Sequence, residues 1–430
     1  MDLVKFNHWW REGKVNSTLV GKPRQALKEI LPYLERRQIL ILKGLRRTGK
    51  TTLFYQIIQY LLKEKKISPY RIMYFSFDEE VADFDELIQT YQREVLKENF
   101  SHGKQPCYLF FDEIHKCKDW PEKLKILYDL HPNLKICVSG SASLTLVRDI
   151  KESLAGRCFE FEITPLDFQE YLKFRGISYQ SERIDIFKEE LLREFELFLS
   201  NSGYIEMINE ENSEIVRRYF RESILERVIY RDIPEQFTTR EPALSFQILT
   251  ILASQPGMLI EYKNLANDLG RDQRTIANYF EYLKWSFLVR ELHFFSPNLL
   301  TSEKKRKKYY LAYPAFGLAL GGEPSKEFRG KLVENLFVSF LKARFFYRST
   351  TNEEVDIVIP RERGFLPIEI KYRVRIQKRD LAGLKSFMSR YKSKKGYLIS
   401  YDFEKECSFS CGEISILPAW KFLLLYPVSR

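Results

Sequence analysis

Residues Gly44–Thr52 form a glycine-rich segment with the pattern of a phosphate-binding loop, GLRRTGKTT. The apolar run Gln38–Leu42 precedes it and the amphipathic stretch Thr51–Leu62 follows it, so strand, loop and helix occur in the order that phosphate binding requires. Glycines let backbone N–H groups turn towards phosphate oxygens, and the N-terminus of the helix adds a favourable dipole. The segment therefore predicts a nucleotide-binding domain.

Individual positions of this loop have expected roles. Lys50 is expected to reach the β- and γ-phosphates of ATP, and the Thr51 hydroxyl to join the ligand shell of Mg²⁺. The other expected nucleotide-binding residues are Gly44, Arg46, Arg47, Thr48, Gly49 and Thr52.

A carboxylate pair follows a second apolar run, Cys107–Phe111. At the end of such a strand Asp112 is expected to hold the Mg²⁺ shell, and Glu113 to polarise the attacking water. The spacing from Lys50 leaves room for an intervening strand, Arg71–Phe77. A kinase is the alternative reaction for a P-loop, but Glu113 favours activation of water.

Two further residues are candidates for catalysis of ATP hydrolysis. Leu134–Ser143 predicts another strand that ends in hydroxyl groups, of which Ser141 is the expected γ-phosphate sensor; a simple turn is the alternative. Arg157 could act as an arginine finger, in cis or towards a neighbouring subunit, or could form a structural salt bridge.

Taken together, these motifs resemble those of a prokaryotic AAA+-superfamily ATPase, from a group in archaea and bacteria that carries a second domain of unassigned function. The motifs that carry the resemblance are Gly44–Thr52, Phe110–His115, Val138–Ser143, Ala155–Arg157 and Thr164–Phe168. The resemblance implies a parallel sheet with helices on both faces, ATP and Mg²⁺ as ligands, and self-association into a homo-oligomer.

Composition limits the class of protein. The chain has 430 residues, of which 44% are hydrophobic, as expected for two or three globular domains. No apolar run approaches the ~20 residues of a membrane span, and Met1–Lys5 lacks the plan of a secretory signal, so we expect a cytoplasmic protein. The six cysteines include no Cys-x-x-Cys pair, which argues against a zinc site.

Positive charge is concentrated in the C-terminal third of the chain. Lys304–Lys308 is a block of five basic residues, and the segment 371–395 holds ten Lys or Arg residues and one acid, Asp380. Such a bias favours a nucleic-acid partner, DNA rather than RNA. A solvated, lysine-rich surface is the alternative for the five-residue block.

The middle of the chain reads as a helical linker or lid, residues 166–240, followed by a winged helix-turn-helix, residues 241–300. The second segment has an apolar pattern of three helices and a strand: Leu244–Ala253, Tyr262–Leu269, Arg271–Trp285 and Phe287–Leu292. Near the start of the third helix, the candidates for DNA contact are Arg271, Arg274 and Asn278. A lid or protein-docking module is the alternative.

Residues 301–430 carry a second constellation of charged residues. Lys331–Phe337 predicts the start of a helix that presents Glu334, and Asp356 and Glu369 lie in strand-like runs, with Lys371 two residues further on. This order resembles the PD-(D/E)XK nuclease fold. Asp356 and Glu369 would then hold Mg²⁺ with support from Glu334, and Lys371 would orient the attacking water. A non-catalytic binding shell is the alternative.

The expected fold is therefore of the α/β class, with a P-loop core over residues 1–165 followed by the three segments above. The expected function is Mg²⁺-dependent ATP hydrolysis by a nucleic-acid-associated protein, with a possible C-terminal nuclease or nucleic-acid-binding activity. The alternative is a nucleotide-dependent regulatory switch whose C-terminal domain docks a partner without catalysis.

Overall fold

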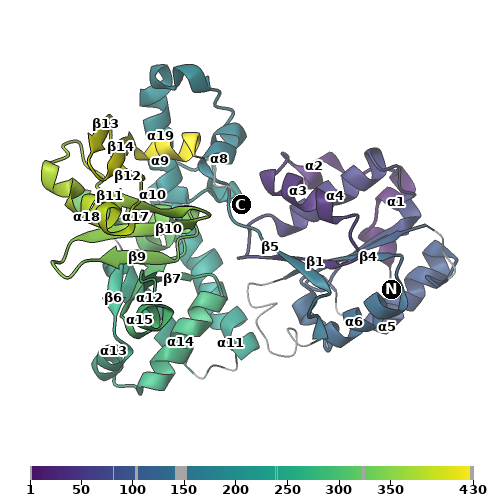
Figure 1. The fold of residues 1–430 in the computed structure, drawn as a ribbon. Helices are drawn as coiled ribbons and strands as arrows, with labels where there is room; N and C mark the ends of the chain where they lie inside the picture. The colour runs from purple at the N-terminus through teal and green to yellow at the C-terminus, as the bar shows by residue number, and fades with distance from the viewer. Residues whose placement is uncertain are drawn as a thin grey trace. The chain divides into compact units, whose positions relative to one another are not determined.

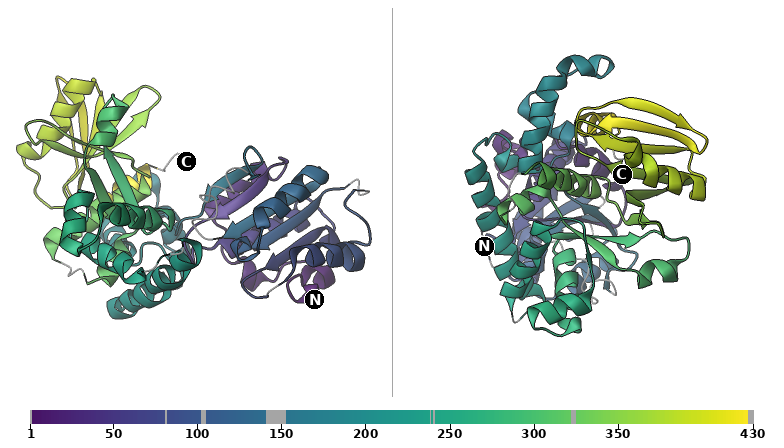
Figure 2. Two further views of the ribbon diagram at one scale, coloured as in Figure 1. Left: turned by 90° about the horizontal axis from the view of Figure 1, so that it is seen from below. Right: turned by 90° about the vertical axis from the view of Figure 1, so that its left-hand side faces the viewer.

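The computed structural model describes residues 2–80, 82–101, 105–140, 153–237, 239, 241–321 and 325–426. The chain divides into two compact units, Met1–Pro165 and Leu166–Arg430, which appear in Figures 1 and 2. Within the described ranges, the helices are too short or too polar to cross a membrane.

Unit 1 is built on a parallel sheet, which in the described residues has five strands in the order β2-β3-β4-β1-β5. The strands are β1 (Ile39–Lys43), β2 (Ile72–Ser76), β3 (Cys107–Asp112), β4 (Leu134–Gly140) and β5 (Cys158–Glu162). The first four are near-continuous apolar runs whose residues are almost all buried. Such runs are expected where helices cover both faces of a parallel sheet.

Helices cover that sheet on both sides (Figure 1). Figure 1 shows α2, α3 and α4 on one side, and α5 and α6 on the other. The helices of unit 1 are α1 (Trp9–Glu12), α2 (Ser17–Val20), α3 (Gln25–Ile30), α4 (Lys50–Lys63), α5 (Phe84–Thr90) and α6 (Trp120–Leu130). The α/β class predicted from the sequence is thereby confirmed.

Unit 2 contains a mixed sheet, which in the described residues has nine strands in the order β13-β14-β12-β11-β10-β9-β7-β8-β6. The strands are β6 (Met258–Ile260), β7 (Val289–Phe294), β8 (Lys307–Leu311), β9 (Phe345–Arg348), β10 (Glu354–Arg361), β11 (Gly364–Ile370), β12 (Lys395–Ser400), β13 (Lys405–Phe409) and β14 (Gly412–Pro418). β9, β10 and β11 are antiparallel neighbours, whereas β12 runs parallel to β11.

The helices of unit 2 fall into a helical segment that precedes the sheet, coloured teal in Figure 2, and helices that alternate with its strands. The first set is α8 (Phe168–Arg175), α9 (Lys188–Asn201), α10 (Ser213–Arg218), α11 (Ile233–Phe237) and α12 (Pro242–Ser254). The second set is α13 (Tyr262–Leu269), α14 (Gln273–Trp285), α15 (Leu299–Lys304), α16 (Pro314–Ala319), α17 (Lys326–Phe340), α18 (Ala382–Tyr391) and α19 (Ala419–Leu425).

Two hydrophobic cores lie against the mixed sheet. Phe195 of α9, Phe337 of α17 and Trp420 of α19 belong to one core, whereas Phe387 of α18 belongs to the other. Along β12, Ile399 belongs to the first core and its neighbour Leu398 to the second. Because successive strand residues point to opposite faces, the sheet is buried on both sides.

Of the three segments that the sequence separated in this half of the chain, residues 241–300 and 301–430 share one sheet, and all three segments contribute to one hydrophobic core. Strand β7 pairs in parallel with β9 through His293 and Phe345, which joins residues 241–300 to the C-terminal strands. Helices α8 and α9 pack in the same core as α17. The sequence does not indicate this pairing of β7 with β9, because the two strands are far apart in the chain.

Candidate functional site

The phosphate-binding loop lies between β1 and α4, and it approaches the last residues of unit 1. A Cβ atom on Gly44 would lie 2.3 Å from the carbonyl oxygen of Ile163, so only glycine fits at this point of the loop. Gly49 has a φ of 91°, which favours glycine, and α4 begins at the next residue, Lys50. The loop therefore leads directly into the N-terminus of a helix, as anion binding requires.

The side chain of Lys50 is held over this loop. It is buried, and its Nζ donates to the carbonyl oxygens of Gly44 and Leu45 at 3.1 and 3.0 Å. The same Nζ lies 3.8 Å from Oε1 of Glu113. Thr48 closes the loop, because its hydroxyl donates to the carbonyl of Leu45 at 2.9 Å. The ammonium group is thus held over the carbonyl groups of the loop.

Asp112 stands at the C-terminal end of β3 with hydroxyl groups around it. The hydroxyls of Thr51 and Tyr74 donate to Oδ2 at 2.6 and 3.0 Å, and that of Ser139 donates to Oδ1. Burial, and then the charge of Glu113, raise the pKa of Asp112, although the hydrogen bonds from Ser139 and Thr51 act in the opposite direction. A divalent cation fits this carboxylate–hydroxyl pair, because its charge would favour the ionised carboxylate.

Glu113 occupies a conformation that a non-glycine residue adopts only when its surroundings hold it there. Its φ of 50° lies in the left-handed region, and its backbone N–H donates to Oγ of Ser139 at 3.3 Å. Its carboxylate lies 3.3 Å from Nδ1 of His115. Residues in this region occur often at functional sites, and the Glu113 carboxylate lies 3.8 Å from Nζ of Lys50.

The other site residues that the sequence predicted for unit 1 differ in their burial and in their contacts. Arg46 is half-buried and Arg47 exposed within the loop, and Thr52 lies in the first turn of α4. Ser141 lies outside the described residues. Arg157 forms a bidentate pair with Asp129 of α6, at 3.0 and 3.2 Å, which is the structural pairing considered as its alternative role.

Sequence reasoning missed two residues of this centre. Ser139, completely buried on β4, bonds to both Asp112 and Glu113. Arg24, also buried, donates to the carbonyls of Thr48 in the loop and of Thr164 at 2.8 and 2.9 Å. The hydroxyl groups at the end of the predicted strand Leu134–Ser143 were a signal for Ser139, whereas no local pattern singles out Arg24.

In unit 2, Asp356 and Glu369 lie opposite each other at the ends of β10 and β11. Asp356 Oδ2 accepts the backbone N–H of Ile370 at 2.8 Å, and Glu369 Oε2 accepts that of Asp356 at 3.3 Å. In β10, Asp356 and Ile357 together oppose a single residue of β9, which is a β-bulge. Such bulges re-aim side chains next to active sites, and here the bulge occurs at the carboxylate.

Glu334 and Lys371 complete this group of charges. Glu334, on α17, accepts from the Tyr310 hydroxyl at 2.6 Å and from Lys331 at 2.9 Å. Strand β11 ends at Ile370, one residue before Lys371, whose ammonium nevertheless donates to Glu369. Helix α17 begins at Lys326, earlier than the sequence pattern indicated, because the hydroxyl of Ser325 caps it.

The carboxyl groups of this cluster do not ionise alike. Burial, and then the charge of Glu334, raise the pKa of Asp356 to about 6, and burial together with Asp356 raises the pKa of Glu369 well above its usual value. Burial also opposes ionisation of Glu334, but Lys308 and Lys331 lower its pKa below the usual value.

These carboxylates line a cavity of about 960 Å³. Its other charged or aromatic lining residues include Lys326, Arg329, Lys331, Lys371, Arg373, Tyr372 and Tyr401. Within the described ranges, no group of three or more His, Cys, Asp or Glu side chains is placed to hold one metal ion. A magnesium ion here would therefore rely on two carboxylates and water, which is a usual set for Mg²⁺.

The basic block Lys304–Lys308 is divided by the fold. Arg306 pairs with Glu261 at 2.7 Å and Lys307 with Glu291 at 2.8 Å, whereas Lys308 is buried beside the carboxylates of the cavity. It is therefore not a uniform surface patch. Only part of it is exposed to a polyanion.

The three candidates for DNA contact lie near the N-terminus of α14. All three side chains are exposed, but Arg271 pairs with Glu241 at 2.8 Å. Arg274 and Asn278 stand one turn apart on the same helix.

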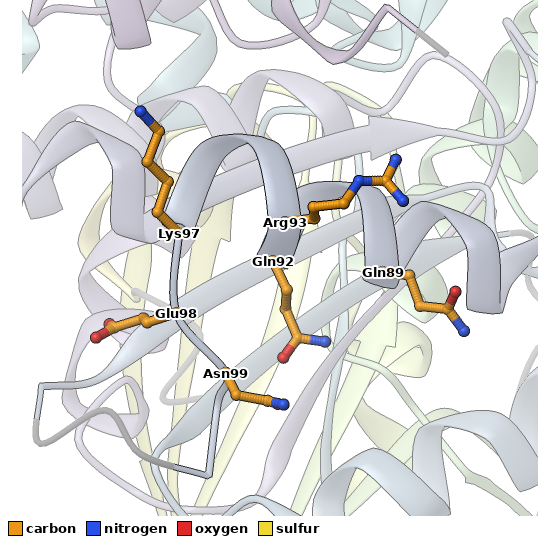
Figure 3. A pocket seen from close by; sticks show the side chains of 6 residues that line it. All are labelled: Gln89, Gln92, Arg93, Lys97, Glu98 and Asn99. Atoms are coloured by element: carbon orange, nitrogen blue, oxygen red, sulfur yellow. The ribbon is translucent and has the colours of Figure 1, made fainter.

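A further cavity of about 520 Å³ in unit 1 is lined by polar side chains (Figure 3): Gln89, Gln92, Arg93, Lys97, Glu98 and Asn99. Figure 3 shows Arg93 and Lys97 pointing away from each other. Glu98 is paired with Arg71, and Gln92 accepts the backbone N–H of Phe100 at 3.0 Å. These side chains do not converge on a common point, so the cavity has no arrangement for chemistry.

Comparison with known proteins bears on the first of these sites. Residues 36–172 match an AAA domain, the family AAA_14. This match supports a P-loop ATPase of the AAA type. Two families described as domains of unknown function match later parts of the chain, DUF8612 over residues 192–327 and DUF4143 over residues 329–422.

The chain also has relatives along most of its length. An uncharacterized protein of Methanocaldococcus jannaschii is 29% identical over 440 residues, covering 96% of this chain and 94% of the relative. A second uncharacterized protein of that organism is 28% identical, covering 91% and 86%. One from Haemophilus influenzae is 20% identical, covering 81% and 86%.

Among solved structures, AMPPCP-bound DnaA from Aquifex aeolicus matches with a TM-score of 0.27 and 16% identity, covering 60% of this chain and 86% of that chain. The Aeropyrum pernix ORC1 protein in complex with DNA matches with a TM-score of 0.29 and 14% identity, covering 71% and 92%. Scores this low do not establish a common fold over the chain.

Proposed function

We propose that unit 1 binds ATP with Mg²⁺ and hydrolyses it. The observation that carries this proposal is the 2.6 Å contact between the Thr51 hydroxyl and Asp112, beside the buried Lys50 and the half-buried Glu113. A P-loop ATPase needs these four groups at one point of the sheet edge.

Each group has a role that follows from its position. Thr51 and Asp112 would hold the Mg²⁺, which neutralises phosphate charge when bound. Lys50 would exchange its carbonyl acceptors for phosphate oxygens, and Glu113 would accept a proton from the attacking water. Gly44, Gly49 and the other loop residues would wrap the phosphates with backbone N–H groups.

The decisive experiment separates binding from turnover. Phosphate release and equilibrium ATP binding are measured for the wild type, Lys50→Ala and Glu113→Gln. We expect Glu113→Gln to keep ATP affinity within a few-fold and to lose turnover by about 10²-fold or more. Lys50→Ala should lose both. If the wild type releases no phosphate unless a second acceptor substrate is present, group transfer replaces hydrolysis.

For unit 2, we propose a nucleic-acid-associated domain of the PD-(D/E)XK type that cleaves phosphodiesters. The observation that favours this function is the convergence of Glu334, Asp356, Glu369 and Lys371 on one cavity. The order α17–β9–β10–β11–α18–β12, with three antiparallel strands and a parallel fourth, supports the assignment.

In that reaction Asp356 and Glu369 would hold Mg²⁺, whose Lewis acidity polarises a phosphate oxygen. Lys371 would orient the attacking water, and the cations of the cavity rim would hold the phosphate backbone. Upstream, the order α12–β6–α13–α14–β7–α15–β8 supports a winged helix, with Arg274 and Asn278 exposed for contact with DNA.

The test is incubation with labelled DNA and Mg²⁺, with and without ATP. Strand scission that is lost in Asp356→Ala but retained in Lys50→Ala would establish a second catalytic centre. DNA binding without scission would make the domain a non-catalytic module and favour the regulatory switch. Absence of both binding and scission would overturn the nucleic-acid role.

A further inference from the structure

Lys308, on β8, is a buried cation at the base of the carboxylate cluster, by which we mean Glu334, Glu354, Asp356 and Glu369. Its side chain is 5% exposed. Its ammonium lies 3.8 Å from Glu334 and 4.0 Å from Asp356, and it forms an ion pair with Glu354. One lysine therefore contacts three of the four carboxylates.

This lysine lies behind the carboxylates, not in the cavity. All four carboxylates and Lys371 line the cavity, whereas Lys308 is not among its described lining residues. The ring of Phe346 packs against the ammonium, with 5.2 Å to its centroid. Lys308 is consequently out of reach of a ligand that enters the cavity, and its effect on that ligand must pass through the carboxylates.

Four cations stand against the carboxyl groups of the cluster before any metal ion binds. They are Lys308, Lys331, Arg348 and Lys371. Carboxylates that are buried together repel each other, and removing one partner of a buried ion pair leaves an uncompensated charge. A divalent cation that enters must therefore add its charge to a group that already contains four cations.

We propose that Lys308 is a positioning residue that holds Glu334, Glu354 and Asp356 together from behind, and that its charge weakens the binding of a divalent cation in the cavity. This inference rests on the proposed role of the cluster as the metal-binding end of the nuclease-like domain.

The position of Lys308 in the chain extends the inference. Lys308 and Tyr310 lie in the segment that matches one family, residues 192–327, whereas the carboxylates lie in the segment 329–422 that matches another. The cluster is thus incomplete without β8, which belongs to the proposed winged helix. Any displacement of β8 would change the charge of the metal site.

The experiment measures Mn²⁺ binding by calorimetry on the full chain, without nucleotide or nucleic acid. Lys308→Met should bind Mn²⁺ at least about tenfold more tightly than the wild type, because a positive charge 4.0 Å from the proposed metal ligand Asp356 is removed. Lys308→Arg, which keeps the charge, should match the wild type. Lys307→Met, the neighbouring cation outside the cluster, is the control, and Asp356→Asn should abolish the binding.

Equal Mn²⁺ affinity in the wild type and Lys308→Met would overturn the inference, as would Mn²⁺ binding that does not depend on Asp356. If Lys308→Met folds only when Mn²⁺ is present, the ion replaces the missing charge and the inference is supported. If it does not fold at all, the double variant Lys308→Met/Glu354→Gln, which removes one charge of each sign, should fold and bind Mn²⁺ as the wild type does; its failure would also overturn the inference.

These outcomes are separate from those of the proposed nuclease. Tighter Mn²⁺ binding in Lys308→Met without scission of DNA by any variant would support the role of Lys308 and reject cleavage. Scission of DNA by the wild type, with unchanged Mn²⁺ affinity in Lys308→Met, would support cleavage and reject the role of Lys308.

Discussion

Ser139 shows how one residue connects the two carboxylates of the ATP site. Its hydroxyl donates to Asp112 and accepts the backbone N–H of Glu113, so it fixes both the proposed metal ligand and the proposed base. The parallel register explains its position: Phe111 pairs with Val138, which places Asp112 beside Ser139. Among the hydroxyls after this strand, sequence reasoning selected Ser141 instead.

A matched pair of variants tests this difference. We expect Ser139→Ala to lower the kcat of ATP hydrolysis by about 10- to 100-fold, because a hydrogen bond to the charged Asp112 is lost, at about 1.5–3 kcal/mol. ATP affinity should change little. Ser141→Ala is the comparison, measured in the same phosphate-release assay. A larger decrease of kcat in Ser141→Ala than in Ser139→Ala would support Ser141 as the γ-phosphate sensor.

The raised pKa of Asp356 predicts a pH dependence of stability. Its folded-state value of about 6 exceeds the ordinary 3.8, so between these pH values the folded chain retains a proton that the unfolded chain has lost. The stability that this proton provides is present at low pH and lost as pH rises through about 6.

The stability of the wild type relative to Asp356→Asn should therefore fall between about pH 4 and pH 7, by up to about 3 kcal/mol. Urea denaturation of both proteins across this range measures the difference. Parallel stability curves would mean that Asp356 is ionised throughout.

Among the elements, β10 combines a functional distortion with a tight packing contact. The bulge at Asp356 interrupts its pairing with β9, and α18 packs closely against the start of the strand. A Cβ atom on Gly383 of α18 would lie 2.1 Å from the carbonyl oxygen of Glu354. The glycine is needed for this approach of helix to strand.

Substitution of Gly383 tests whether the close contact between α18 and β10 limits the stability of the protein. Gly383→Ala should destabilise the protein by about 1–3 kcal/mol, because the helix must move away from β10. Gly330→Ala on α17 is the control, since no atom lies within 4 Å of the added methyl group; it should stabilise by up to about 1 kcal/mol. Thermal melting of both variants measures the effect, and similar shifts would contradict the packing argument.

On the scale of the whole molecule, the net charge of +11 is placed mostly where nucleic acid is proposed to bind. The segment 371–395 runs from the cavity rim through α18 to β12, and most of its cations are exposed. Some are engaged, as Arg373 is with Asp380. Arg375 and Lys378 are exposed and serve as test positions.

Affinity for DNA should fall by several orders of magnitude between about 50 and about 200 mM salt if six or more phosphates are contacted. Arg375→Ala/Lys378→Ala should weaken binding about equally for all sequences and reduce the salt slope by about 2. The control is Arg11→Ala/Lys14→Ala in unit 1, which removes two exposed cations outside the segment. An equal loss of DNA affinity in both double variants would indicate that binding depends on the net charge of the protein and not on the segment 371–395.

Short segments of sequence were enough to propose the ATP site, because its parts are local. The strand, loop and helix around Gly44–Thr52, and the strand that ends at Asp112, each follow from a contiguous pattern of apolar residues and glycines. The same holds for Glu334, Asp356, Glu369 and Lys371, whose convergence on one cavity was expected from their order along the chain.

The sequence by itself determined the α/β class and the phosphate-binding loop with its flanking strand and helix, since these depend on residues close together in the chain. Only the tertiary structure decided that Ser139 lies beside Asp112 and that β7 joins two sequence segments in one sheet. It also decided that Lys308, the last residue of the basic block, is buried among the carboxylates of the cavity. Each depends on the register between distant strands. That register is set by packing of the whole unit, and no local pattern of residues encodes it.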